Sequence, residues 1–231
     1  MIPSALSMTG STSSVNVGSG ASLDNVQTGS VMAWVKVTSV TSPKHNIFQK
    51  AVAALDSSYQ YFGIGDGTNG ILAFYINRAT TDLSALSPSG TVVINRWQFV
   101  AASWNGAGAN TDQHLYIGDL LTPAAETTYT TQTVGAGTFN SNAAASLYLG
   151  NKSNNSAQLT GVMALCALSN VQLSLDEIRA VQYRATIPRG CIGFWRPGMY
   201  GRGVVIDESG SGNHGTQTAC VPVNDVLPRV G

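Results

Sequence analysis

The feature that most constrains the fold of this chain is the close spacing of its turns. Runs of apolar or alternating residues are short, and clusters of Gly, Asn, Asp and Ser end most of them. Many short strands separated by turn residues are typical of an antiparallel sandwich or barrel. The 231 residues are enough for one large domain of this kind. The turn pattern therefore predicts an all-β fold.

Two pairs of apolar runs flank turn sequences, and each pair predicts a hairpin. Residues 59–64 and 71–78 flank GDGTNG, whereas 97–104 and 114–117 flank NGAGANTDQ. Residues 161–168, GVMALCAL, are apolar throughout, which predicts a buried strand. Further strands are expected at 30–40, 47–55, 91–95 and 146–150, and residues 120–139 are expected to hold one exposed strand and a loop.

One segment, residues 173–184, has helical rather than strand periodicity. Its apolar residues recur at a spacing of about three positions. Ser174 and Glu177 have the spacing of a capping box, in which each side chain bonds the other's backbone N–H. Pro188 lies just beyond the segment and disfavours a longer helix. These signals predict one short helix near the C-terminal third.

Low charge restricts the classes of function. Charged residues make up 10% of the chain, against about 25% in an average soluble domain, and the formal net charge is zero. This excludes a nucleic-acid binder that neutralises phosphates and a protein held on membranes by a polybasic patch. No apolar run is long enough for a transmembrane helix, and the N-terminus lacks the pattern of a secretory signal. With Met1 at its start, the chain is expected to be made and assembled in the cytoplasm.

The chain contains, in this order, SVMAWVKV (30–37), RWQFVAASWNG (96–106), HLYIGD (114–119), LYLGNK (147–152) and a late strand followed by its helix (161–182). Together these stretches resemble the laminin G-like, concanavalin A-like lectin/glucanase jelly rolls. The resemblance implies an all-β jelly-roll sandwich of two antiparallel sheets with one short helix. We expect residues 1–186 to form the jelly-roll domain. Residues 187–231 would be a C-terminal extension that completes the sandwich or contacts a partner.

The order of one stretch departs from the family pattern. Residues 207–216, DESGSGNHGT, are similar to a stretch that begins the domain in many relatives. Here the stretch comes near the end of the chain. Its strand is therefore expected either to pair beside the N-terminal strand or to belong to an outward extension.

Phage-encoded chains with this jelly roll are similarly small and weakly charged. The resemblance implies a non-enzymatic virion structural protein of a bacteriophage, either a capsid decoration or cement protein or a head-fibre component. It would be located in the virion after assembly in the host cytoplasm, as a homo-oligomer bound to the major capsid protein or another virion protein. Because aromatic residues and Met are enriched in interface cores, the expected contacts are Phe194, Trp195, Met199 and Tyr200.

The first alternative is a carbohydrate-binding module or adhesin that recognises a cell-surface glycan. Such sites use aromatic rings to stack on pyranose faces and polar side chains to bind the hydroxyl groups. Tyr59 and Tyr61 precede the glycine-rich turn, and Asp66 and Asn69 lie within it. These four residues are the expected ligand-binding residues.

Calcium is a candidate cofactor, because lectins of this superfamily often carry it in loops at one edge of the sandwich. Asp66 with Asn69, and Asp207 with Asn213, have the oxygen ligands that calcium prefers. Both stretches are also ordinary turn sequences, in which Asp and Asn bond their own backbone. The sequence leaves both interpretations open and requires no cofactor.

The second alternative, a glycoside hydrolase, needs two carboxylates about 5 to 10 Å apart across the sugar. The pairs Asp176–Glu177 and Asp207–Glu208 are adjacent in sequence, so their members do not share a face of a regular element. No GxSxG motif is present, and we expect no enzymatic activity and no catalytic residue. The histidines are expected to be exposed or hydrogen-bonded, and the cysteines, which lack a CxxC pair, to be buried thiols: His45, His114 and His214, and Cys166, Cys191 and Cys220.

Overall fold

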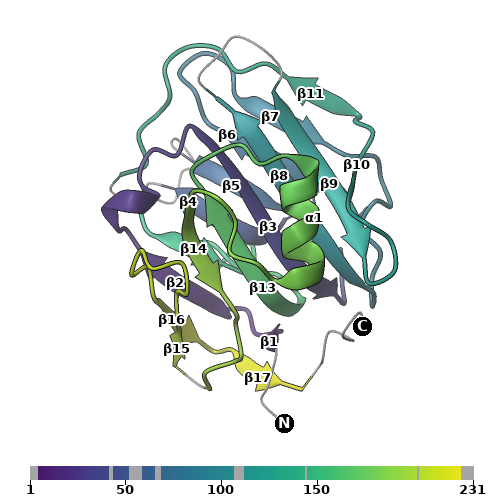
Figure 1. Cartoon of the computed structure of the whole chain (residues 1–231), viewed down its shortest axis with the longest axis vertical. Helices are drawn as coiled ribbons and strands as arrows, with labels where there is room; N and C mark the ends of the chain where they lie inside the picture. Colours follow the sequence, from purple (N-terminus) through teal and green to yellow (C-terminus); the bar gives the residue numbers. More distant parts are fainter. Residues whose placement is uncertain are drawn as a thin grey trace.

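The computed structural model describes residues 5–41, 44–51, 59–65, 69–106, 112–143, 145–201 and 203–224. These residues form two antiparallel sheets, with one α-helix on the outside (Figure 1). The predicted jelly-roll sandwich is confirmed. Within the described ranges, no helix is long and apolar enough to cross a membrane.

Sheet A has the strand order β10–β9–β8–β3–β13–β1–β17, and β14 also pairs with β13. Its strands are β1 (Ala5–Met8), β3 (Thr28–Val37), β8 (Trp97–Asn105), β9 (Gln113–Asp119), β10 (Ala125–Glu126), β13 (Gly161–Ser169), β14 (Cys191–Trp195) and β17 (Val221–Val223). The hairpin of β8 and β9 is the second hairpin that the sequence predicts.

Sheet B has the strand order β11–β7–β6–β5–β4–β12–β2–β16–β15. Its strands are β2 (Ser14–Gly18), β4 (His45–Ala51), β5 (Tyr59–Ile64), β6 (Leu72–Ile76), β7 (Leu83–Leu86), β11 (Thr131–Thr133), β12 (Leu147–Leu149), β15 (Val204–Val205) and β16 (Gly215–Thr218). The first predicted hairpin is that of β5 and β6. The part of the predicted strand 47–55 that follows Ala51 lies outside the described residues.

The main core lies between the two sheets. Phe74 of sheet B packs against Trp104 of sheet A with ring centroids 4.7 Å apart, and Phe48 packs against Trp195 at 6.3 Å. Trp104 and Trp195 are fully buried. Because the inward residues of both sheets fill this layer, the side chains that alternate with them on each strand point to the outer faces.

The helix α1 (Leu175–Arg184) covers the outer face of sheet A, and a short 3-10 helix (Ala21–Leu23) follows β2 (Figure 1). Ile178 and Val181 of α1 are buried in one cluster with Trp34 and Phe99 of the sheet. Sheet A is therefore covered on both faces, which explains why every residue of β13 is buried. The predicted capping box, with Ser174 as the N-cap, is confirmed.

Two predictions about secondary structure are wrong. Residues 91–95 form a turn instead of a strand, because Asn95 has a left-handed φ of 60° that ends the extended chain. Residues 120–139 hold two short strands instead of one. β10 joins the edge of sheet A and β11 joins the edge of sheet B, so this segment crosses from one sheet to the other.

Residues after 190 contribute strands to both sheets. β14 pairs with β13, β17 pairs with β1, and β16 pairs with β2. Of the two positions expected for the DESGSGNHGT strand, the structure shows the one beside an N-terminal strand, because β16 lies against β2. Segments from both ends of the chain are therefore side by side in each sheet (Figure 1).

Candidate functional site

The outer face of sheet B differs from that of sheet A, because none of the described helices packs on it. On each strand, inward residues of the main core alternate with outward residues. Val15 and Val17 of β2, and Leu147 and Leu149 of β12, belong to the core, so the residue between each pair points outward. The outward residues are polar or tyrosine at most positions, and they form the candidate site.

Eight of these outward residues lie directly opposite one another across eight strands, and we call them the polar row. Each neighbouring pair is in register in the sheet. The row runs, in order, through Thr216, Asn16, Tyr148, Gln49, Tyr61, Tyr75, Ser84 and Thr133. It offers hydroxyl groups, amides and three aromatic rings, and it contains no carboxylate, ammonium or guanidinium group.

The centre of the polar row is closed. Tyr61 is only 3% exposed, and its ring lies over Gly63, where a Cβ would approach the Tyr61 hydroxyl to 2.7 Å. The Lys44 ammonium stands 5.9 Å from the centroid of the same ring. The ring of Tyr61 is therefore not accessible for stacking on a sugar, and the expectation that it does so is wrong.

The other residues expected to bind a ligand are not brought together with Tyr61. Tyr59 lies in β5, two residues before Tyr61, but its side chain is outside the described part of the structure. Asp66 also lies outside the described residues. Asn69 is exposed in the loop before β6, where its carbonyl accepts a hydrogen bond from the N–H of Gly90 at 2.6 Å.

One wing of the polar row is accessible and ordered by its own contacts. Asn16 Nδ2 donates to the Tyr148 hydroxyl at 3.3 Å, and Asn16 Oδ1 accepts from the N–H of Gly18 at 2.9 Å. The pairing of β12 with β2 shifts by one residue between Leu147 and Tyr148, which is a β-bulge. Bulges re-aim side chains and are frequent beside functional sites. Tyr148 and Asn16 are both half-buried, so part of each remains open to a ligand.

The second calcium candidate loop is occupied by protein hydrogen bonds. Asp207 is 5% exposed, and its carboxylate accepts from the backbone N–H groups of Phe194, Ser209 and Asn213, each at 2.9 Å. Asn213 Nδ2 in turn donates to Ile192 O at 2.6 Å. The loop thus ties the C-terminal segment to β14. Among the described residues, no group of three His, Cys, Asp or Glu side chains is arranged to hold a metal ion.

The carboxylate pairs noted in the sequence take part in local structure. Glu177 completes the capping box of α1 and accepts from Arg189 Nε at 3.0 Å. The hydrogen bonds from Arg189 and from the Ser174 N–H lower the pKa of Glu177. Glu208 accepts from the Tyr200 hydroxyl at 3.1 Å.

The four residues expected to contact a partner are divided by the structure. Phe194 and Trp195 are fully buried in the interior, so the expectation that they contact a partner is wrong. Adjacent residues of a strand point to opposite faces of the sheet. Trp195 therefore lies in the main core between the sheets, and Phe194 lies in the cluster under α1. Met199 is half-buried and Tyr200 is 48% exposed, so these two remain on the surface.

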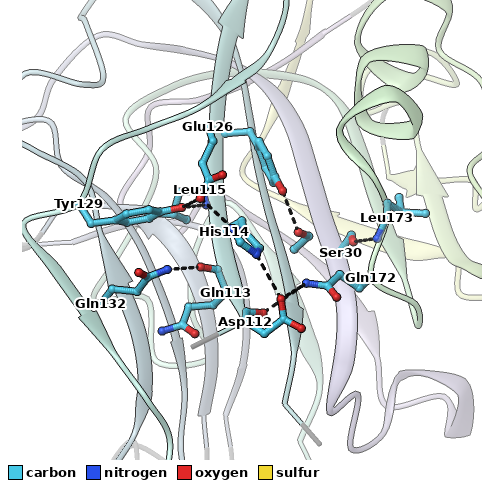
Figure 2. A network of polar contacts seen from close by, with 12 residues as sticks. Ser30, Asp112, Gln113, His114, Leu115, Glu126, Tyr129, Gln132, Gln172 and Leu173 are labelled. Atoms are coloured by element: carbon cyan, nitrogen blue, oxygen red, sulfur yellow. Dashed lines mark hydrogen bonds and ion pairs between the residues drawn. The ribbon is translucent and has the colours of Figure 1, made fainter. Parts of the chain in front are cut away.

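Sequence reasoning missed a polar network at the other edge of sheet A, around His114 (Figure 2). The two ring nitrogens of His114 face Glu126 Oε1 at 2.8 Å and Asp112 Oδ1 at 3.2 Å. Gln172 Nε2 donates to Asp112 at 2.9 Å, and the Tyr129 hydroxyl donates to Glu126 at 2.5 Å. From the sequence, His114 is expected only to be exposed or hydrogen-bonded. Asp112, two residues before His114, was a local signal, whereas Glu126 comes from the paired strand β10.

The His114 network sets the position of residues 125–133, the crossing segment between the two sheets. Leu115 N–H donates to the Tyr129 hydroxyl at 3.0 Å. Gln113 Nε2 donates to the carbonyls of Ser84 and Thr133, both at 2.9 Å. Ser84 and Thr133 are the last two members of the polar row. The crossing segment therefore connects the edge of sheet A to one end of the candidate site.

Comparison with known families supports the fold. A sequence profile described as the concanavalin A-like lectin/glucanases superfamily matches residues 9–179. This match confirms the resemblance noted from the sequence motifs. A search of curated protein sequences finds no significant match.

Solved structures with the same fold share little sequence with the chain. A Bacteroides ovatus protein described as a candidate carbohydrate-binding protein has a TM-score of 0.60 at 12% identity, with 96% of this chain and 60% of that chain covered. A pentraxin from Limulus polyphemus has a TM-score of 0.51 at 12% identity, with 77% and 80% covered. The enzymatically active domain of tailspike protein 2 of bacteriophage CBA120 has a TM-score of 0.51 at 17% identity, with 86% and 33% covered.

Proposed function

Because the chain belongs to the concanavalin A-like lectin/glucanases superfamily, we propose that it is a non-enzymatic glycan-binding protein and that the polar row is its binding face. The observation that carries the proposal is the register of the row. Eight strands place hydroxyl, amide and tyrosine side chains opposite one another on one face. Sugars present hydroxyl groups and apolar ring faces, and tyrosine complements both with its ring and its hydroxyl group.

Two further features support a binding role. The solved Bacteroides ovatus structure with this fold is described as a candidate carbohydrate-binding protein. In addition, the polar row lacks the paired carboxylates of a glycoside hydrolase, and each described carboxylate pair contributes to local structure elsewhere.

The proposal is tested on a glycan array with the full chain and three single variants. Tyr148→Ala and Tyr75→Ala each remove a half-buried ring from the polar row, whereas Tyr200→Ala removes a surface ring outside it. We expect glycan binding by the native chain, about tenfold or greater weakening by a row variant, and no change for Tyr200→Ala. A chain that binds no glycan, or that loses binding equally in all three variants, would contradict the proposal.

We further propose that the protein is a virion component of a bacteriophage, either a capsid decoration or cement protein or part of a head fibre. The observation that favours it is a set of exposed apolar side chains in the C-terminal segment. Tyr200, Val204 and Val221 are each 46 to 48% exposed. Such side chains suit an interface with the major capsid protein or with another copy of the chain. A similar fold in a phage tailspike supports the same placement.

The virion proposal is tested by sedimenting native source material through a high-salt gradient with quantitative mass spectrometry of each fraction. High salt screens ionic contamination, while apolar contacts persist. We expect the chain to travel with the particle at a fixed ratio to the main shell protein. Tyr200→Ser should lower this ratio, and Tyr148→Ala should leave it unchanged. If the chain stays at the top of the gradient, the virion proposal is wrong and the glycan proposal stands on its own test.

A further inference from the structure

We infer that the wing of the polar row formed by Asn16 and Tyr148 binds an uncharged sugar unit, stacked on the Tyr148 ring. This inference rests on the proposed glycan-binding function and narrows it to one place and one chemical class of ligand. It is carried by three observations: a pre-ordered ring, open space beside that ring, and the absence of charge on the strands around it.

Asn16 holds the Tyr148 ring in place before a ligand arrives. Both ends of its amide are engaged, because Oδ1 accepts from Gly18 N–H at 2.9 Å and Nδ2 donates to the Tyr148 hydroxyl at 3.3 Å. A register shift between Leu147 and Tyr148 lies beside this pair of hydrogen bonds. A binding group that is already ordered loses less conformational entropy on association. Asn16 is therefore a positioning residue, and Tyr148 is the contact residue.

The surface beside the ring is open. Apart from its chain neighbours, no atom of the described residues lies within 4 Å of the position that a Cβ would take on Gly18. Thr216 and Thr218 on the neighbouring strand are exposed. The Tyr148 hydroxyl serves as an acceptor for Asn16, and a phenolic hydroxyl can both accept and donate a hydrogen bond. The wing therefore offers a ring and nearby hydroxyl groups to a ligand, in contrast to the closed centre around Tyr61.

No charged side chain belongs to the three strands of the wing, β2, β12 and β16. Lys50 of the adjacent strand β4 points into the protein, where its ammonium donates to Asp24 Oδ1 at 2.9 Å and to Ala145 O at 2.6 Å. A carboxylate or sulfate on the sugar would lose water here without gaining a partner of opposite charge, which is unfavourable. A neutral hexose loses only the water bound to its hydroxyl groups, and hydrogen bonds to the wing replace the bonds to that water.

The test measures affinity for matched pairs of neutral and anionic oligosaccharides, the latter carrying sialic or uronic acid, at about 0.05 M and about 0.5 M NaCl. We expect the neutral member of each pair to bind at least about tenfold more tightly, with a change of less than about twofold between the two salt concentrations. Tyr148→Ala should abolish this binding. Asn16→Ala should weaken it by about three- to tenfold, and Tyr148→Phe should weaken it less than Tyr148→Ala.

Thermal unfolding of each variant distinguishes a lost contact from a lost fold. Tyr183→Ala serves as the matched tyrosine control, because Tyr183 is also half-buried but lies in α1, on the other sheet. Preference for the anionic sugars, with binding that falls as salt rises, would overturn the inference and leave the glycan function in place. Loss of neutral-sugar binding in Tyr75→Ala but not in Tyr148→Ala would overturn the location of the site. Absence of any glycan binding would overturn the proposed function and this inference with it.

Discussion

Asp207 shows how one buried side chain joins distant parts of this chain. Its carboxylate accepts hydrogen bonds from three backbone N–H groups, one in β14 and two in the loop that follows Asp207. Trp195 Nε1 donates to Asn213 O at 2.7 Å, so the same loop also holds a fully buried indole. A carboxylate with these partners has a structural role, because its oxygens are already occupied by hydrogen-bond donors.

Asp207→Asn is expected to lower the free energy of unfolding by about 2 to 3 kcal/mol, because an amide nitrogen cannot accept from the backbone and charge-assisted hydrogen bonds are lost. Urea denaturation measures the change. The control is Glu208→Gln at the next position, where the carboxylate pairs with Arg196 nearer the surface at 3.5 Å. We expect that variant to change stability by less than about 1 kcal/mol. Equal costs for the two variants would contradict the structural role of Asp207.

At the scale of single elements, α1 has a favourable start and an unfavourable end. Ser174 and Glu177 form a complete capping box at the N-terminus. The C-cap residue is Ala185, which has the left-handed φ of 49° that usually requires glycine. A side chain in this conformation costs about 1 to 2 kcal/mol. The helix therefore carries strain at its last position that a single substitution can relieve.

Ala185→Gly is expected to raise the free energy of unfolding by about 0.5 to 1 kcal/mol, because glycine adopts the left-handed conformation without strain. The matched control is Ala180→Gly, the same substitution inside α1. There it should lower stability by about 1 kcal/mol, since glycine is a poor residue for a helix interior. Two stability changes of the same sign would show that the C-cap conformation is not what limits this helix.

The crossing segment is a second element whose stability depends on a local arrangement. Partial burial acts to lower the pKa of His114, but the hydrogen bonds and charges of Glu126 and Asp112 outweigh it, so the pKa is raised above its usual 6.5. Both carboxylates accept hydrogen bonds fully only when both ring nitrogens carry a hydrogen, which is the imidazolium form. The charged ring therefore holds Glu126, and with it the crossing segment, against β9 (Figure 2).

Because the folded pKa lies above the unfolded value, the stabilisation from His114 is complete below about pH 6.5 and is lost as pH rises through the folded pKa. We expect His114→Gln to lower the free energy of unfolding by up to about 1 kcal/mol near pH 5.5, and by less near pH 8.5. Burial lowers the pKa of His45, so His45 changes stability with pH in the opposite direction. Because His45 is present in both proteins, its contribution cancels in the difference between them. A difference between the two proteins that grows with pH would contradict the assignment.

Across the whole molecule, each sheet is assembled from both ends of the chain. β14, β16 and β17 pair with β13, β2 and β1, and Phe194 and Trp195 fill the layers on the two sides of sheet A. Losing a large buried aromatic side chain typically costs about 3 to 5 kcal/mol, against a total stability of about 5 to 15 kcal/mol. The described residues of the C-terminal extension, 187–201 and 203–224, therefore contribute a large share of the folding energy.

A chain that ends at residue 186 is expected to lack a cooperative unfolding transition, since both sheets and both core layers would be incomplete. Near-ultraviolet circular dichroism and thermal unfolding provide the measurement. Co-expression of residues 187–231 as a separate chain should restore the transition, which separates missing contacts from a nonspecific folding defect. If the shortened chain alone unfolds cooperatively with native-like spectra, the extension is dispensable for the fold.

Local pattern was enough to predict the elements whose stability is mainly local. The strands at 59–64 and 97–104 and the capping box at Ser174 follow from alternation and from spacing of three residues, which act between near neighbours in sequence. The segment 91–95 has strand composition, but it lies where Asn95 turns the chain into β8. The residue types in this segment occur both in turns and at the ends of strands. Composition alone therefore does not show where the chain turns.

The sequence predicted the types of residue in the candidate site but not where the site lies. The sequence indicated tyrosines and amides for sugar binding, and it singled out Tyr61. Tertiary packing then closed Tyr61 under Lys44 and left Tyr148 accessible beside Asn16. Asn16 and Tyr148 are 132 residues apart in sequence, so only the pairing of β12 with β2 brings them together.

The sequence by itself therefore determined the all-β class, the helix and its cap, and the low charge of the chain, because these depend on composition and short-range periodicity. The tertiary structure decided which tyrosines are open and where the C-terminal strands pair. Each of these depends on the register between strands that are far apart in sequence. A shift of one residue in such a register would turn every side chain of a strand to the opposite face.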